Sequence, residues 1–379
     1  MNEAGVYVHI PFCRRKCLYC DFPSYAGREE FYGAYKDAVI NEIDNTEELR
    51  GSVIDSIFFG GGTPTVLPAR FLAEILGRVL TYSTSSNAEI SLEANPGAVN
   101  EDALRVLRNA GFNRLSLGIQ AWRDHLLKRL GRIHSAEDIP RAYEAAVNAG
   151  FDNINLDLMF SLPGQTLDDW TESLRKTAAL KPAHISAYSL IIEEGTEFYR
   201  LYNQEALKPP DEEEDRRMYY AACDILASYG YHQYEISNFA LEGRECRHNI
   251  KYWKRLPYLG VGTDSHSFYN NMRWHNTHSL EKYLRTAHGH DISGLREDIA
   301  QISVSEAMEE TMFLGLRLNE GVDEDSFRRA SGSGLFEIYG GVIEKMISLG
   351  LMAYADNRVF LTAKGRDVSN YVFTDFMLG

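Results

Sequence analysis

The chain has 379 residues, of which 44% are hydrophobic and 25% are charged, a composition typical of a globular protein with one large domain and a smaller one. No segment approaches the run of about eighteen apolar residues that a membrane-spanning helix requires, so we expect a soluble protein. The formal net charge of −15 argues against a nucleic-acid-binding protein, because such proteins carry a basic surface that neutralises phosphates.

Through the first half of the chain, short β-rich runs alternate with amphipathic helical patterns. The predicted strands are residues 6–10, 53–59, 89–94, 114–118, 153–158 and 184–191. The predicted helices are residues 31–43, 71–82, 102–110, 136–149 and 167–180. This alternation is typical of a parallel sheet. A closed eight-unit barrel needs about 250 residues, so the pattern predicts an incomplete barrel or an open doubly wound sheet.

The second half of the chain lacks this regular strand–helix alternation. A linker is expected near residues 193–210, followed by a helix at 218–229 and a strand at 231–239. Helical patterns at 307–316, 326–330 and 342–349 precede a predicted hairpin at 351–362, an order that resembles a winged-helix module. DNA binding is not expected of this module, because Glu337 and Glu344 offset the cations Arg328 and Arg329.

Three cysteines, Cys13, Cys17 and Cys20, follow the first predicted strand at intervals of four and three residues. Structural zinc takes four protein ligands, and the two other cysteines, Cys223 and Cys246, lie far along the chain without a paired spacing. A [4Fe–4S] cluster takes one thiolate per iron, so three cysteines leave one iron open to a non-protein ligand. Disulfides are not expected, because an odd number of cysteines and the lack of a signal segment fit a reducing cytoplasm.

Glycine or polar residues follow five of the predicted strands. The cysteine loop follows the first strand, the run Gly-Gly-Gly-Thr-Pro at 60–64 follows the second, Glu93 ends the third, Gln120 follows the fourth, and Asp157 ends the fifth. The carboxyl ends of parallel strands meet at one rim, where α/β proteins build their active sites. The glycines let the backbone come close to a bound molecule and present amides to a carboxylate or phosphate. A simple turn is the alternative for the glycines, and each carboxylate taken alone fits a structural role.

The spacing Cys13-x-x-x-Cys17-x-x-Cys20 is similar to the motif of the radical S-adenosylmethionine (SAM) family. With Tyr-Val-His-Ile-Pro-Phe-Cys at 7–13 and Gly-Gly-Gly-Thr-Pro-Thr at 60–65, the chain resembles the branch that contains oxygen-independent coproporphyrinogen III oxidase and the HemW-type heme chaperones. The resemblance covers nearly the whole chain. It implies an α/β fold with an incomplete (β/α)6 barrel at 1–200, a connecting region at 201–300, and a mostly helical, winged-helix-like domain at 301–379.

The resemblance also implies cofactors and their ligands. Cys13, Cys17 and Cys20 would ligate the [4Fe–4S] cluster, and the amino and carboxylate groups of SAM would bind the open iron. The residues implied to flank the cluster or to contact SAM are Tyr7, Tyr19, Gly61, Gly62, Thr63, Glu93, Gln120, Arg132 and Asp157. The implied chemistry is reductive cleavage of SAM to methionine and a 5′-deoxyadenosyl radical, which the barrel shields.

Residues 248–253, His-Asn-Ile-Lys-Tyr-Trp, match the HNxxYW signature of the HemW-type branch, which implies heme binding by His248, Tyr252 and Trp253. A neutral imidazole is a good axial ligand for heme iron, and the two aromatic rings offer flat apolar faces for a porphyrin. The alternative is a hydrogen-bonded core histidine with two core aromatics. Three further histidines, His266, His275 and His278, are additional candidate ligands.

Two features depart from the oxidase pattern. Phe22 stands where the oxidase carries a fourth cysteine, and Cys13 lies almost at the start of the chain, whereas the oxidase has an extension ahead of its cluster motif. We therefore expect a cytoplasmic heme chaperone that hands heme to apo-hemoproteins, with the oxidase or another radical SAM enzyme acting on a tetrapyrrole as the alternative. The family further implies dimerisation and delivery of heme toward respiratory enzymes at the membrane.

Overall fold

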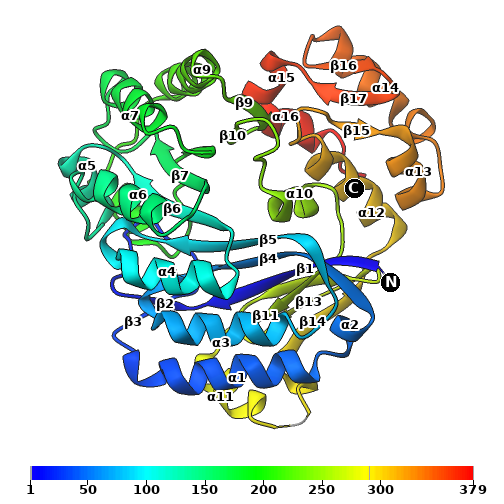
Figure 1. The fold of residues 1–379 in the computed structure, drawn as a ribbon. Helices are drawn as coiled ribbons and strands as arrows, with labels where there is room; N and C mark the ends of the chain where they lie inside the picture. The colour runs from blue at the N-terminus through cyan, green and yellow to red at the C-terminus, as the bar shows by residue number, and fades with distance from the viewer. Residues whose placement is uncertain (1, 290, 379) are drawn as a thin grey trace.

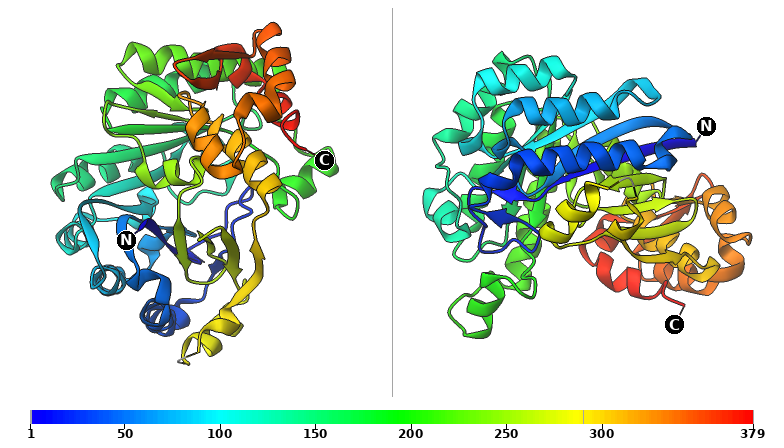
Figure 2. Two further views of the ribbon diagram at one scale, coloured as in Figure 1. Left: turned by 90° about the vertical axis from the view of Figure 1, so that its right-hand side faces the viewer. Right: turned by 90° about the horizontal axis from the view of Figure 1, so that it is seen from below.

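The computed structural model describes residues 2–289 and 291–378. Its main element is one sheet of twelve strands, which is covered by helices on its outer face and joined to a small C-terminal module (Figures 1 and 2). No helix among the described residues is long and apolar enough to cross a membrane.

Six parallel strands form the middle of the sheet, and each overlaps a strand predicted from the sequence, although the last one ends at Ser189, two residues before the predicted end. They are β1 (Asn2–Ile10), β4 (Ser52–Gly61), β5 (Thr84–Ala94), β6 (Arg114–Gln120), β7 (Asn153–Phe160) and β8 (His184–Ser189). The helices between them are α1 (Tyr32–Asn45), α2 (Glu47–Arg50), α3 (Ala69–Val79), α4 (Glu101–Ala110), α5 (Asp124–Leu130), α6 (Asp138–Asn148) and α7 (Leu167–Ala179). The short strands β2 (Phe12–Cys13) and β3 (Tyr25–Ala26) pair around the cysteine loop. The order of the six long strands in the sheet repeats their order in the chain, as in other strand–helix repeats.

Residues 201–300 build both edges of the same sheet. After α8 (Glu197–Asn203) and α9 (Glu212–Ser228), the strands β9 (His232–Glu235) and β10 (Asn238–Ala240) extend the sheet beyond β8. After α10 (Arg247–Trp253), β11 (Tyr258–Val261) pairs in parallel with β1, and β12 (His266–Tyr269), β13 (Met272–Asn276) and β14 (Arg296–Gln301) follow beyond it, with α11 (Leu280–Ala287) between the last two. Because β14 and β9 stand at opposite ends of the strand order, the described strands leave the barrel open.

Two local expectations differ from this arrangement. The strand predicted at 231–239 is a hairpin of two short antiparallel strands, because Ile236 and Ser237 turn between β9 and β10. The linker predicted at 193–210 contains helix α8, whose first turn is capped by the side chain of Thr196.

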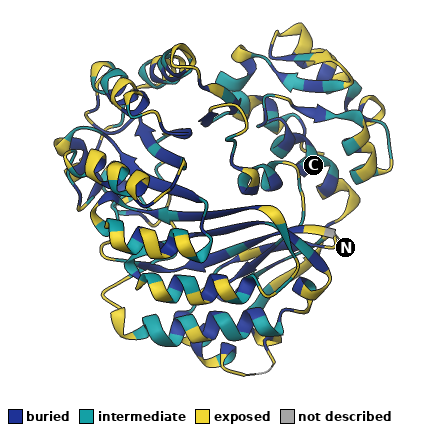
Figure 3. Cartoon of the chain, in the orientation of Figure 1, coloured by how far each residue is buried: buried dark blue, intermediate teal, exposed yellow. Residues whose placement is uncertain are grey.

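The two faces of the parallel strands carry different side chains, since successive residues point to opposite sides of a sheet. The outer face is apolar: Val6, Val8, Ile57 and Leu92 are buried in the main hydrophobic core. In Figure 3 the helices that cover this face, α1, α3 and α4, are exposed on their far side. The inner face instead carries polar and aromatic residues, among them Tyr7, Phe58, Glu93, Arg114 and Ser116. A face of this kind is suited to line a binding site, because buried polar groups need partners.

The C-terminal module has its own hydrophobic core. It contains α12 (Val304–Gly315), α13 (Glu324–Ser331), α14 (Leu335–Ser348), α15 (Ala363–Asp367) and α16 (Ser369–Thr374), with the strands β15 (Val322–Asp323), β16 (Met352–Ala355) and β17 (Arg358–Leu361). The three predicted helices and the predicted hairpin are therefore confirmed. Strand β15 pairs with β17 and completes a small sheet.

Helix α10 lies on the inner face of the large sheet, opposite the covering helices (Figure 1). The carboxylate of Glu89 on β5 holds its N-terminus, because it accepts hydrogen bonds from the backbone N–H groups of Arg247 (3.1 Å) and His248 (3.2 Å). A negative charge at a helix N-terminus is favourable. One strand residue thus fixes the helix that carries the 248–253 motif.

Candidate functional site

The cysteine loop packs beside the loop that follows β4. Cys13 Sγ lies 3.6 Å from Thr63 Oγ1, and Cys17 Sγ lies 3.5 Å from Arg132 Nη1. Burial raises the pKa of the Cys13 thiol and raises the pKa of Cys20 to about 11, so binding of a metal releases protons from these thiols. Within the described residues, no three Cys, His, Asp or Glu side chains form a ligand set for a single metal ion. The thiols fit a cluster, whose irons take one thiolate each.

Two backbone hydrogen bonds join the glycine loop to the cysteine loop. The N–H of Gly62 donates to the Ile10 carbonyl oxygen (2.8 Å), and the N–H of Thr63 donates to the Phe12 carbonyl oxygen (2.8 Å). A Cβ atom at position 62 would lie 2.5 Å from the Phe12 carbonyl oxygen, and one at Gly61, whose φ is +107°, would lie 2.6 Å from the His9 ring. The glycines are therefore needed for the close approach of these two loops.

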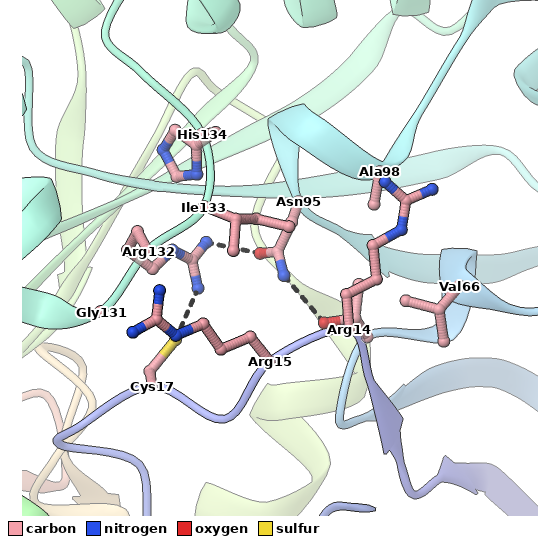
Figure 4. Close-up of a pocket in the computed structure, with 11 residues that line it drawn as sticks. Arg14, Arg15, Cys17, Val66, Asn95, Ala98, Gly131, Arg132, Ile133 and His134 are labelled. Atoms are coloured by element: carbon pink, nitrogen blue, oxygen red, sulfur yellow. Dashed lines mark hydrogen bonds between the residues drawn. The ribbon is translucent and has the colours of Figure 1, made fainter. Parts of the chain in front are cut away.

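Arg132 connects the cluster loop to β5 and β6. Figure 4 shows its guanidinium between Cys17 and Asn95; it donates to the Cys17 sulfur, to Asn95 Oδ1 and to the Gly118 carbonyl oxygen. Asn95 Nδ2 in turn donates to Thr63 Oγ1 at 2.8 Å. The guanidinium therefore donates a hydrogen bond to the sulfur of a predicted cluster ligand and ties the cysteine loop to β5 and β6.

Two carboxylates, Glu93 and Asp157, face the same cavity from β5 and β7. Asp157 accepts hydrogen bonds from Ser116 Oγ (2.8 Å) and Asn155 Nδ2 (2.7 Å). Burial, followed by the nearby charge of Asp157, raises the pKa of Glu93 to about 8. Glu93 is therefore a buried carboxyl group that can donate a hydrogen bond to a ligand at neutral pH, whereas Asp157 is held as an acceptor by its two donors.

One cavity of about 160 Å³ gathers these groups. Its lining includes the three cysteines and every residue predicted to flank the cluster or to contact SAM except Tyr7: Tyr19, Gly61, Gly62, Thr63, Glu93, Gln120, Arg132 and Asp157. Gln120 adopts a φ of +62°, a left-handed backbone conformation that is rare for residues other than glycine and that often occurs at functional sites. Thiols, carboxyls, an amide and glycine backbone thus converge on one space, a donor set that suits an iron–sulfur cluster with an amino-acid–nucleoside cofactor.

A larger cavity of about 420 Å³ adjoins the first one, and the two share Phe22, Gly61 and Glu93 in their linings. Tyr7 lines this second cavity rather than the first, as do Phe58, Tyr252 and Tyr258. Its size lies in the range of about 300–1,000 Å³ that is usual for small-molecule sites. Phe22, whose residue surface is 60% exposed, stands where the two cavities meet.

The 248–253 motif does not present its three predicted heme-binding side chains to one space. Tyr252 lines the second cavity, but His248 is fully buried. His248 Nδ1 lies 2.9 Å from Ser56 Oγ, and His248 Nε2 lies 2.9 Å from the Tyr252 hydroxyl. Burial lowers the pKa of His248 to about 3, so its ring is neutral. Both ring nitrogens are already engaged in this conformation, and heme binding by His248 stays a prediction.

Trp253 points away from His248, toward the C-terminal module. Arg317 lies over its indole ring, with 4.4 Å between the guanidinium carbon and the ring centroid. Trp253 also lines a separate hollow with Leu318 and Val322. Tyr252 and Trp253 reach different sides of α10 because neighbouring residues on a helix point in different directions.

Several residues of the two cavities were missed from the sequence. Ser24, Asn95, Ser116 and Gly118 line the cluster cavity, and Asn249 lines the larger one. Along β6, Ser116 and Gly118 point to one face of the sheet, and the apolar residues between and beside them point to the other. Strand alternation is the signal that could have found these two residues, whereas Asn95 is placed by a turn that has no distinctive pattern.

The open α/β sheet and the three-cysteine cavity at the carboxyl ends of its strands define a radical SAM protein. Residues 7–177 match the model of the radical SAM superfamily, and residues 302–368 match that of the HemN C-terminal domain. The match to this superfamily implies a [4Fe–4S] cluster and SAM as cofactors. The residues that line the cluster cavity fit both groups.

Full-length relatives give a narrower assignment. The chain is 37% identical to the protein named heme chaperone HemW of Bacillus subtilis, over 98% of this chain and 99% of that relative, and 35% identical to heme chaperone HemW of Lactococcus lactis, over 99% and 97%. The solved structure of coproporphyrinogen III oxidase (HemN) from Escherichia coli superposes with a TM-score of 0.84, covering 100% of this chain and 90% of that one, at 22% identity. That likeness shows a shared fold. The chain belongs to the HemW family of radical SAM proteins.

Proposed function

We propose that this protein is a heme chaperone, which binds heme and transfers it to apo-hemoproteins in the cytoplasm and carries a [4Fe–4S] cluster and SAM in its cluster cavity. The observation that carries the proposal is the identity of 37% along almost the whole chain to a relative named heme chaperone HemW. Two features of the structure support it: a cavity of about 420 Å³ with aromatic walls, and its shared lining with the cluster cavity.

The chain's own residues have separable tasks in this proposal. Cys13, Cys17 and Cys20 hold the cluster, while Arg132 donates a hydrogen bond to the Cys17 sulfur. Glu93, between the cavities, offers a proton to a ligand on either side. When bound, the cluster and SAM supply one-electron chemistry.

Phe22 separates this proposal from decarboxylation of coproporphyrinogen III. The sequence places Phe22 where the oxidase carries a fourth cysteine, and the structure places its ring at the junction of the two cavities. An apolar ring at this place has no thiol to offer to a substrate or radical. It does fit the apolar body of a porphyrin.

The test is a heme titration followed by a transfer assay on anaerobically reconstituted protein. We expect stoichiometric heme uptake, seen as a Soret band, and transfer of that heme to an apo-hemoprotein faster than the same acceptor gains heme across a dialysis membrane. The parallel sample contains SAM, a reductant and coproporphyrinogen III. Protoporphyrinogen formed with turnover in that sample, or a wild-type protein that takes up no heme, would contradict the chaperone proposal.

A dimer and an acceptor among membrane respiratory enzymes are further parts of the proposal. They rest on what the family resemblance implies. Sedimentation of the heme-loaded and heme-free protein tests the first, and crosslinking of the loaded protein to isolated respiratory complexes tests the second.

A further inference from the structure

Five exposed cations lie on and beside the cysteine loop. They form what we call the basic surface: Arg14, Arg15, Lys16, Lys128 and Arg129. Three of them stand between the predicted cluster ligands Cys13 and Cys17, and the other two lie in the last turn of α5. The backbone N–H of Leu18 donates to the Leu130 carbonyl oxygen (3.0 Å), which holds the end of α5 against the loop. Figure 4 shows Arg14 and Arg15 extending from this loop in different directions.

The charges of the basic surface are not neutralised by paired carboxylates. Within residues 2–289 and 291–378, none of the five cations forms an ion pair. Arg14 and Arg129 donate to backbone carbonyl oxygens, at 3.1 Å and 2.7 Å, which leaves their charge in place. Two acidic residues adjoin the same segments: Asp21 is exposed, and Asp124 at the start of α5 accepts a hydrogen bond from the Ala136 N–H (2.8 Å). Five cations beside these two acids leave a net positive charge.

This local charge is opposite in sign to that of the whole chain, whose formal net charge is −15. An acidic partner is repelled by most of an acidic protein and attracted by a basic region on it. Complementary charges of this kind steer the encounter of two proteins and fix their relative orientation. The basic surface is therefore suited to orient an acidic partner over the cysteine loop.

A partner on the basic surface lies beside the predicted cluster. Cys13, Cys17 and Cys20 are half-buried, so the loop that would hold the cluster is at the surface of the molecule. The cleavage implied for bound SAM is reductive and consumes one electron. It needs a donor whose redox group comes close to the cluster, and the cations between Cys13 and Cys17 lie where such a donor has to bind.

From these observations we infer that the basic surface is the docking site of an acidic electron-carrier protein, which contains a flavin or an iron–sulfur group. The inference rests on the cluster and SAM of the proposed function and identifies a partner for them. An electron passes from the reduced carrier to the oxidised cluster, so that the carrier loses one electron and the cluster gains one. Interfaces between electron-transfer proteins are small, below about 1,200 Å² of buried surface in total, a size that suits one loop and one helix end.

The test measures binding of a flavodoxin, an acidic protein that contains FMN, to the cluster-free and the reconstituted protein by calorimetry. We expect the affinity of wild type to fall as the salt concentration rises, because salt screens exposed charges. The double variant Lys16→Glu/Lys128→Glu reverses one charge on the loop and one on α5, and should weaken binding about tenfold or more. Both lysines are exposed, so the circular dichroism spectrum should stay unchanged.

Lys181→Glu/Arg285→Glu is the matched control, because it changes the net charge of the chain by the same amount. Lys181 follows α7 and Arg285 lies in α11, and both are exposed. This variant should bind flavodoxin as wild type does. The second readout is the rate at which reduced flavodoxin bleaches the absorbance of the reconstituted cluster. The rate should fall about tenfold or more in Lys16→Glu/Lys128→Glu, whereas dithionite, a small reductant, should reduce the cluster of every variant to the same extent.

Three outcomes overturn the inference: a wild type that does not bind flavodoxin, wild-type binding that salt does not weaken, or equal weakening in the two double variants. Binding of wild type to vesicles that contain phosphatidylglycerol, lost in Lys16→Glu/Lys128→Glu and without binding of flavodoxin, would assign the surface to a membrane instead. None of these outcomes touches heme uptake, on which the chaperone proposal depends. A protein that docks flavodoxin through the basic surface but takes up no heme would lose the chaperone proposal and keep this inference.

Discussion

The substitution Gly62→Ala tests the contact between the glycine loop and the cysteine loop. The added Cβ atom would lie 2.5 Å from the Phe12 carbonyl oxygen and 2.9 Å from both the carbonyl carbon and the nitrogen of Phe12. All three atoms belong to backbone, so the clash cannot be relieved by rotation of a side chain. One loop must move away from the other.

That movement has a cost that the structure allows us to estimate. It stretches the hydrogen bonds from Gly62 to Ile10 and from Thr63 to Phe12, each of which contributes about 1 kcal/mol, and overpacking adds about 1–3 kcal/mol. We expect Gly62→Ala to lower the free energy of unfolding by about 3–5 kcal/mol if both hydrogen bonds are lost. Because Cys13 follows Phe12 directly, the variant should also retain less iron after reconstitution.

The assays are urea unfolding of the cluster-free protein and iron determination after anaerobic reconstitution. Gly77→Ala is the matched control, because Gly77 lies in α3 and a Cβ atom there meets nothing within 4 Å. Alanine in a helix interior gains up to about 1 kcal/mol over glycine, so this variant should be slightly more stable. An unfolding midpoint and iron content for Gly62→Ala equal to wild type would refute the reasoning.

Three further predictions concern the cluster and the motif helix. Cys17→Ser should abolish cluster absorbance after reconstitution, while Cys223→Ser, on α9 away from the cavity, should keep it; equal loss in both would contradict the cluster assignment. Arg132→Lys should weaken SAM binding about tenfold or more in calorimetry, because lysine cannot reach Cys17, Asn95 and Gly118 together and each hydrogen bond of a charged group contributes about 1.5–3 kcal/mol; unchanged affinity would show that this bridge is not needed. His248 has a pKa lowered to about 3 by burial, so its contribution to stability is present above about pH 6.5 and is lost as the pH falls toward 3. Between pH 7 and pH 5 the loss is about 2 kcal/mol, and the fall in urea midpoint over this range should be smaller in His248→Gln than in wild type; parallel falls would show that His248 is not buried as a neutral ring.

The sequence alone determined the cluster loop and the parallel core of the fold. The spacing of Cys13, Cys17 and Cys20 predicts a cluster ligand set by itself, because the chemistry depends on residues that are neighbours in the chain. The same holds for the strand–helix alternation, which predicted all six long parallel strands. Since parallel strands end at one rim, the positions of Glu93, Gln120 and Asp157 also followed, and the structure brings them into one cavity.

Only the tertiary structure decided where residues 201–300 lie in the sheet. Their strands add to both edges of the sheet, so that Tyr258 comes beside Gly5 although the two lie at distant points of the chain. Strand register of this kind depends on packing over the whole sheet and leaves no local pattern. Of the three additional candidate histidines, only His266 is in the lining of the larger cavity, and that placement follows from the register rather than from the sequence pattern.

The directions of the motif side chains were likewise decided by packing. The pattern 248–253 names a histidine, a tyrosine and a tryptophan without saying which way each one points. Glu89 fixes the start of α10, which turns His248 toward Ser56 and Trp253 toward Arg317. Buried polar groups need hydrogen-bond partners, and both ring nitrogens of His248 have one. Tyr252 lies at the cavity wall.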